Sequence, residues 1–147
     1  MEKTFTDYQL GEKIVTSSIT VTESHIVNFA SYTGDFYPLH MDEEFAKASM
    51  FKGRIAHGPL IFSLSVGLVG MTGYYKDSII AFVAGDEMRF FNPVKIGDTI
   101  KVEVEVVEKV ETSKPERGIV KFKYTVLNQH NVKAMSIVMS QMVHKKY

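Results

Sequence analysis

The segment that begins at Gly58 reads GPLIFSLSVGLVGM and carries no charged side chain on any face of the helix that it favours. A helix at the surface of a domain keeps a polar face toward water, so this helix has to be enclosed by other elements. Pro59 suits the first helical turn, where its missing N–H is not needed. The whole apolar stretch, Ile55 to Met71, is interrupted by glycines and falls short of the roughly 20 residues that span a bilayer. We predict a helix buried inside protein and no membrane partner.

The second half of the chain has the pattern of strands. Four runs of strand character follow one another, at roughly 79–92, 98–111, 117–128 and 131–144. In the second run, the apolar residues Ile100, Val102, Val104 and Val106 alternate with charged side chains, and the third run alternates in the same way. Such alternation is typical of a strand with one buried face and one wet face. We predict an antiparallel meander.

The first third of the chain combines a strand with two helices. The β-branched run from Ile14 to Val21 predicts a strand, and Thr22 then suits the N-cap of a helix that ends at a left-handed Gly34. The segment DFYPLH, residues 35–40, is expected to be a loop, because Pro38 prevents a helix from continuing through it. A short helix should start at the acidic residues 42–44 and end near Ser49.

A twisted antiparallel sheet and one helix that is apolar all round bury each other best when the sheet curls around the helix. This arrangement is the hotdog fold, which is of the α+β class. With 147 residues the chain has the size of one domain, so we assign residues 1–147 to a single domain. A single curled sheet leaves its edges and one end of the helix uncovered, which favours a homodimer or a higher homo-oligomer.

Composition narrows the possible partners. The 17 basic and 17 acidic residues give a formal net charge of zero, so we expect no nucleic-acid partner. The absence of cysteine removes thiol nucleophiles and cysteine-based zinc sites, and no pair of histidines has the spacing of metal ligands, so we expect no metal. The first residues, MEKTFTDYQLGEK, lack the apolar run of a signal peptide, which makes the cytoplasm the expected location.

Three short features bring reactive groups into the sequence: Gly34-Asp35 after a helix, Pro38-Leu39-His40 in the loop, and His57-Gly58-Pro59 before the buried helix. Each has an ordinary structural reading, as a helix cap with an Asx turn or as a histidine bonded to backbone. Together they supply a carboxylate, an imidazole and a helix N-terminus with free N–H groups. These are the parts needed for acid/base chemistry beside a polarised carbonyl.

The segment YTGDFYPLHMDEEFA, followed by RIAHGPLIFSL, resembles the MaoC-like, (R)-specific enoyl-CoA hydratase family. The positions that fit the family's motif are Tyr32, Gly34, Asp35, Pro38, Leu39, His40 and Ala46, and the later segment RFFNPVKIGD, residues 89–98, is also similar. The resemblance implies a homodimer of hotdog subunits that adds water to a trans-2-enoyl-CoA to give an (R)-3-hydroxyacyl-CoA, or catalyses the reverse dehydration. It also implies that Asp35 and His40 act on one water, that the Gly58 amide binds the thioester oxygen, and that coenzyme A belongs to the substrate, with no separate cofactor.

Two positions depart from the family and bear on substrate binding. Tyr37 stands where the family usually has asparagine, and Val66 stands where one branch has a serine on the buried helix. Both are expected near the acyl group, whose identity the sequence leaves open. His57 is expected either at the substrate or as a buried structural histidine. Arg54, with Lys52, Arg89 and Lys95, is a candidate for the phosphates of coenzyme A.

Two other functions remain as alternatives at this stage. A hotdog acyl-CoA thioesterase would need a carboxylate on or near the central helix, and no Asp or Glu occurs between Gly58 and Met71. A non-catalytic acyl-CoA-binding module would have no need of the Asp35 and His40 pair. Both observations favour the hydratase.

Overall fold

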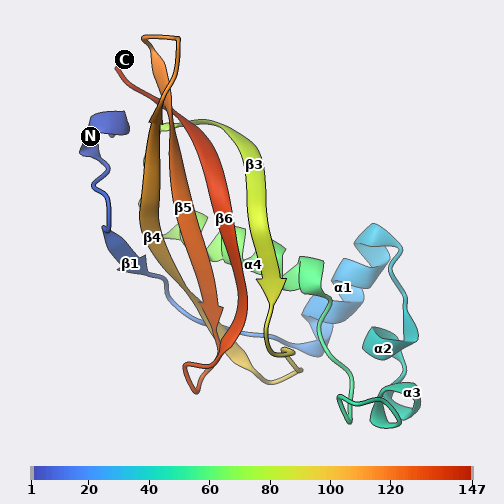
Figure 1. Ribbon diagram of the computed structural model, residues 1–147. Coiled ribbons are helices and arrows are strands. Elements are labelled where there is room, and N and C mark those ends of the chain that lie inside the picture. Colours follow the sequence, from blue (N-terminus) through green and yellow to red (C-terminus); the bar gives the residue numbers. More distant parts are fainter. Residues whose placement is uncertain (1, 147) are drawn as a thin grey trace.

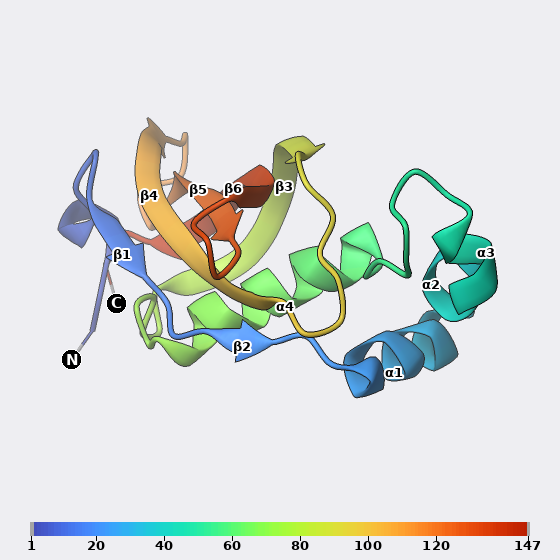
Figure 2. The same cartoon turned by 90° about the horizontal axis from the view of Figure 1, so that it is seen from below.

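The computed structural model describes residues 2–146 and places helix α4 (Gly58–Met71) across the concave face of a six-stranded antiparallel sheet (Figures 1 and 2). The strands are β1 (Lys13–Val15), β2 (Ile19–Thr20), β3 (Ile79–Phe90), β4 (Thr99–Glu111), β5 (Arg117–Leu127) and β6 (Lys133–His144). The remaining helices are a 3₁₀ turn (Phe5–Asp7), α1 (Glu23–Thr33), α2 (Pro38–Met41) and α3 (Glu43–Lys47). The predicted α+β arrangement, a curled sheet around an apolar helix, is confirmed.

The sheet covers only part of α4 within one chain. Leu60, Ile61, Leu68 and Val69 are buried against the sheet, as the apolar composition requires. On the opposite side, however, Val66 is 41% exposed and Met71 is 72% exposed. A single subunit therefore leaves the end of the helix uncovered, as predicted, and it leaves Val66 within the helix partly exposed as well.

The sheet is not a simple meander of the last four strands. Strands β4, β5 and β6 are neighbours in chain order, but β3 pairs with β6 at the far edge. The connection from β3 to β4, residues 91–98, has to cross the sheet, and Val94 anchors it by accepting a hydrogen bond of 2.7 Å from the Ala56 amide. This crossing carries the connection past the start of α4 and leaves β3 with one unpaired edge (Figure 1).

The predicted first strand, Ile14–Val21, is divided into β1 and β2. The break occurs at Thr16, whose hydroxyl accepts a hydrogen bond of 2.9 Å from the Val102 amide. That side-chain bond replaces a bond of the backbone ladder, so the strand bends there. Helix α1 begins and ends as expected, with Thr22 at its N-cap and Gly34 in the left-handed conformation at a φ of 80°.

The loop expected around Pro38 contains the one-turn helix α2 instead. Proline has the backbone angle of a helix already, so it starts a helix as readily as it ends one. His40 therefore lies on a helical turn, while α3 follows at Glu43 as predicted. Helices α1, α2 and α3 gather at the end of the molecule where α4 begins (Figure 2). No helix within residues 2–146 is long and apolar enough to cross a membrane.

Candidate active site

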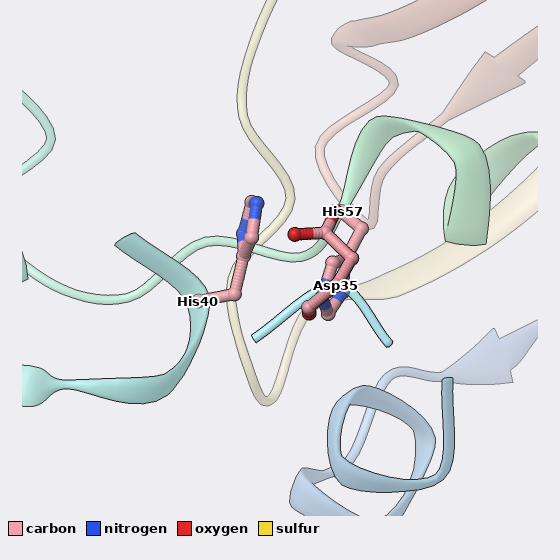
Figure 3. Close-up of side chains that lie close together, drawn as sticks. All are labelled: Asp35, His40 and His57. Carbon is pink, nitrogen blue, oxygen red and sulfur yellow. The ribbon is translucent and has the colours of Figure 1, made fainter. Parts of the chain in front are cut away.

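Three predicted residues meet at the start of α4. Asp35 comes from the segment after α1, His40 from α2, and His57 from the residue that precedes α4 (Figure 3). One carboxylate oxygen of Asp35 and one ring nitrogen of each histidine lie within 4.8 Å of one another. Residues that are far apart in the sequence thus form one compact cluster, which the fold builds by bringing α1, α2 and α4 together.

The ring of His40 is oriented by a backbone carbonyl. Its Nδ1 lies 2.8 Å from the carbonyl oxygen of Ile55. A carbonyl only accepts hydrogen bonds, so Nδ1 donates and carries the proton of the neutral ring. The other nitrogen, Nε2, is then the atom of His40 that accepts a proton, as a general base requires.

Asp35 is held through its main chain while its side chain stays exposed. Its amide donates to the Thr33 hydroxyl at 3.2 Å, and its carbonyl accepts a bond from His57. One carboxylate oxygen, Oδ1, accepts from the Tyr37 amide at 3.3 Å, which is the Asx turn that the sequence allowed. A single water at about 2.8 Å from each partner can bridge groups as close as Asp35 and His40.

His57 supports both members of this pair. Its ring is fully buried, donates from Nε2 to the Asp35 carbonyl at 3.0 Å, and stacks on the His40 ring with centroids 4.0 Å apart. Burial lowers the pKa of His57, and the charge of a protonated His40 lowers it further. The structure therefore places His57 behind the reactive pair as a buried neutral ring.

The cluster also has the donor types of a metal site. However, the two rings are stacked with an interplanar angle of only 29°. A metal ion lies in the plane of each imidazole that binds it, and two stacked planes do not share such a point. The geometry thus suits acid/base chemistry better than a metal, and the expectation of no metal stays a prediction.

The amide of Gly58 is the first N–H of α4, and no acceptor among residues 2–146 takes a hydrogen bond from it. Since helix N-termini favour negative charge, this amide can stabilise an oxygen that gains charge.

A Cβ on Gly58 would lie 2.8 Å from Cζ of Phe90, so the absence of a side chain lets this ring lie against the helix start. Phe90, Phe51 and Val94 help to line a cleft of about 330 Å³ at this point. Phe90 falls in the segment 89–98 that resembles the family, but the sequence did not show that its ring packs on Gly58.

The other three residues that were predicted to bind substrate lie at the edge of this cluster or outside it. Tyr37 lies at the edge of the cluster, with its half-exposed ring 6.3 Å from that of His40. Val66 lies two turns further along α4, at a second cleft. The guanidinium of Arg54 donates to Glu23 at 2.6 Å and to Glu43 at 3.2 Å, so it ties α1 to α3. Its predicted contact with the phosphates of coenzyme A would compete with these ion pairs.

The comparisons with known proteins agree with this geometry. The model of the MaoC like domain matches residues 6–128, which is most of the chain. The chain belongs to the MaoC-like dehydratase family. It is 36% identical over 107 residues to the (R)-specific enoyl-CoA hydratase of Rhodospirillum rubrum, covering 72% of this chain and 69% of that protein. It is also 40% identical over 100 residues to Protein MaoC of Klebsiella aerogenes, covering 68% of this chain but only 29% of that protein.

Two solved structures have the same fold. A monoamine oxidase regulatory protein from Archaeoglobus superposes with a TM-score of 0.94 and 39% identity, covering 99% of this chain and 96% of that one. A Mycobacterium tuberculosis protein described as having a double hotdog fold superposes with a TM-score of 0.85 at 19% identity, covering 98% of this chain and 44% of that one. At such low identity the second match shows the fold alone, and it confirms the predicted hotdog fold.

His57 should make the stability of the folded chain depend on pH. The pKa of His57 is lowered in the folded chain, whereas in the unfolded chain it has the ordinary histidine value of about 6.5. Near and below that pH, the unfolded chain therefore binds a proton at His57 more readily than the folded chain does. Stability should therefore fall as the pH drops from about 7.5 to about 5.5. Melting temperatures across this range should show a slope that His57→Gln reduces. His130→Gln, at an exposed turn, is the matched control, and an unchanged slope in His57→Gln would contradict the prediction.

Proposed function

We propose that this protein adds water to a trans-2-enoyl-CoA to form an (R)-3-hydroxyacyl-CoA, or catalyses the reverse dehydration. The observation that carries the proposal is the Asp35 carboxylate within 4.8 Å of the His40 imidazole, beside a Gly58 amide that donates to no acceptor among the described residues. Membership of the MaoC-like family and the similarity to a protein named (R)-specific enoyl-CoA hydratase support it.

In this proposal the two acceptors hold one water. With its proton on Nδ1, His40 accepts from the water at Nε2 while a carboxylate oxygen of Asp35 accepts the second hydrogen. The lone pairs of the water oxygen then face the β-carbon of the alkene. As the C–O bond forms, the pair takes one proton from the water and returns one to the α-carbon, so that H and OH add in total.

The developing negative charge needs its own partner in the transition state. Attack at the β-carbon moves electrons through the α-carbon to the thioester oxygen, which becomes an enolate. The Gly58 amide donates to this oxygen, and the dipole of the 14-residue helix α4 favours the charge there. Since both contributions exist before the substrate binds, little reorganisation is required during the reaction.

One comparison favours a second candidate. The Archaeoglobus protein with 39% identity is named a monoamine oxidase regulatory protein, and a regulatory role suits a module without catalytic activity. The intact pair of Asp35 and His40 favours catalysis, because a binding module needs neither a base nor an acid. No Asp or Glu lies on α4 itself, which disfavours a thioesterase that carries its carboxylate on this helix.

The first test is turnover of crotonyl-CoA and longer trans-2-enoyl-CoAs by the purified protein. We expect loss of the absorbance of the conjugated thioester, and chiral analysis should give the (R)-3-hydroxy product. Release of free thiol would indicate a thioesterase instead. Binding of the thioester without any turnover would support the regulatory candidate and reject the hydratase.

The second test removes the pair. Asp35→Asn and His40→Gln should each lower kcat by about 10²–10⁴-fold, the usual contribution of a positioned acid or base. Because both act on one water, the double variant should be scarcely worse than the poorer single variant. Kinetics should be measured beside thermal melts of all three variants. Full activity with a lowered melting temperature would show that the two residues are only a helix cap and a loop contact.

We further propose that the protein is a homodimer joined along β3. This 12-residue strand has an unpaired edge, and Ile80, Phe82, Val83 and Met88 are each at least 40% exposed. A long apolar edge strand pairs readily with a second copy. The open side of α4 adjoins β3, since Val66 and Phe82 line the same cleft, so a partner paired at this edge borders that cleft.

Light scattering at micromolar concentration should give the mass of two chains. Val83→Lys places a charge on the free edge and should shift the mass toward one chain. Val107→Lys is the matched control, because Val107 is 38% exposed but lies on β4, which has a neighbour on each side. A monomeric wild type, or equal masses for both variants, would reject the β3 interface.

A further inference from the structure

A second cleft lies beside α4, away from the Asp35 and His40 pair. Its volume is about 290 Å³, and residues from three elements line it: Phe62, Ser63 and Val66 of α4, Phe82 of β3, and Met139 and Gln141 of β6. All but two of these side chains are apolar. Ser63 uses its hydroxyl to bond the Pro59 carbonyl at 2.8 Å within the helix. Gln141 is therefore the polar group that this cleft offers to a ligand.

Gln141 interrupts an otherwise apolar face. Alternate residues of β6 face α4, and Met135, Ile137, Met139 and Val143 on this face are buried members of the core. Gln141 is only 6% exposed, and its Oε1 is buried with no hydrogen-bond partner among residues 2–146. Leaving a buried polar atom unpaired destabilises a fold, whereas methionine has a similar size and no such cost. An unpaired amide at this position points to a partner that comes from outside the chain.

The cleft lies within reach of the proposed active site. Pro59, Ser63 and Val66 are exposed and occur at helical spacing, so they form one open stripe along α4. Val66 is eight residues beyond Gly58, or about 12 Å along the axis at the rise of an α-helix. A thioester held at the Gly58 amide can extend its acyl chain along this stripe toward Gln141. The separation suits an acyl chain of medium length.

We propose that this cleft binds the far end of the acyl chain, and that Gln141 accepts a hydrogen bond from a hydroxyl group carried there. The inference rests on the hydratase function proposed above and names its substrate class, hydroxylated medium-chain trans-2-enoyl thioesters. An unsubstituted chain fills the apolar part of the cleft but leaves the amide unpaired. A hydroxylated chain fills the apolar part of the cleft and also bonds the amide. Sites that bond a buried substrate hydroxyl discriminate strongly against analogues that lack it.

The test compares ω-hydroxy and unsubstituted trans-2-enoyl-CoAs of equal length, from hexenoyl to decenoyl. At the length that reaches the cleft, the wild type should prefer the hydroxylated substrate by about tenfold in kcat/KM, as expected for one well-placed hydrogen bond. Gln141→Met should abolish or reverse this preference. Gln129→Met is the matched control: that side chain bonds Asp98 and the Thr99 amide at the surface, so the ratio of the two kcat/KM values should not change.

A second measurement does not need turnover. Gln141→Met should raise the melting temperature, because it removes an unpaired buried amide. The saturated ligand ω-hydroxyoctanoyl-CoA should raise the melting temperature of the wild type more than octanoyl-CoA does, and the variant should lose this difference. A lower melting temperature in the variant would mean that protein groups already satisfy the amide, and would overturn the proposal.

The outcomes separate this inference from the proposed function. Turnover of enoyl-CoAs without any preference for the hydroxyl, or with a preference that Gln141→Met retains, rejects the role of Gln141 and leaves the hydratase standing. If no enoyl-CoA is hydrated, the hydratase fails, and with it the substrate class inferred here. The comparison of the two saturated ligands then reports only whether the cleft binds a hydroxylated chain.

Discussion

The burial of α4 against the concave sheet is the contact on which the rest of the molecule depends. Leu60, Ile61, Leu68 and Val69 fix the helix in position and rotation, and their burial removes a large apolar area from water. Because the helix is fixed, its first residue, Gly58, is fixed as well, and so is His57 just before it. The candidate site is therefore built at the start of a helix that the core holds in place, while its reactive side chains come from shorter elements that pack onto this helix start.

His57 connects the reactive pair to the start of α4. Its hydrogen bond to the Asp35 carbonyl restrains the segment after α1, and its stacking on His40 restrains the ring carried by α2. On the solvent side, the ion pairs of Arg54 with Glu23 and Glu43 join α1 to α3, and Arg54 also donates to the His40 carbonyl at 3.4 Å. The start of α4 thus restrains Asp35 and His40 on the buried side. The ion pairs of Arg54 restrain the surrounding helices on the solvent side. A site that must place two side chains around one water requires such restraint on both sides.

The sequence predicted the elements whose formation is local. Thr22 and Gly34 bound α1, and the residues from Gly58 to Met71 form the central helix, because caps and apolar periodicity act over a few residues. The place of β3 beside β6 depends on contacts between distant segments, which local patterns do not reveal. The predicted meander therefore holds for β4, β5 and β6 but is wrong for β3. In the site, Asp35 and His40 were found from their motif, but the Ile55 carbonyl that orients His40 has no side-chain signature. Arg54 looked like a phosphate ligand because a sequence does not show which acidic residues will face it.

Two buried acceptors within residues 2–146 lack hydrogen-bond partners, Nδ1 of His57 and Oε1 of Gln141, and both lie beside the same helix. Each destabilises the fold, and an apolar residue of similar shape would remove that cost. In His57 the unpaired nitrogen follows from its role, since the ring has to donate from Nε2 to Asp35 and burial keeps it neutral. Gln141 shows no such internal role, because its Oε1 takes a hydrogen bond from no residue between 2 and 146. Since this buried acceptor opens onto a cleft beside the helix, a ligand that donates to it explains its presence best.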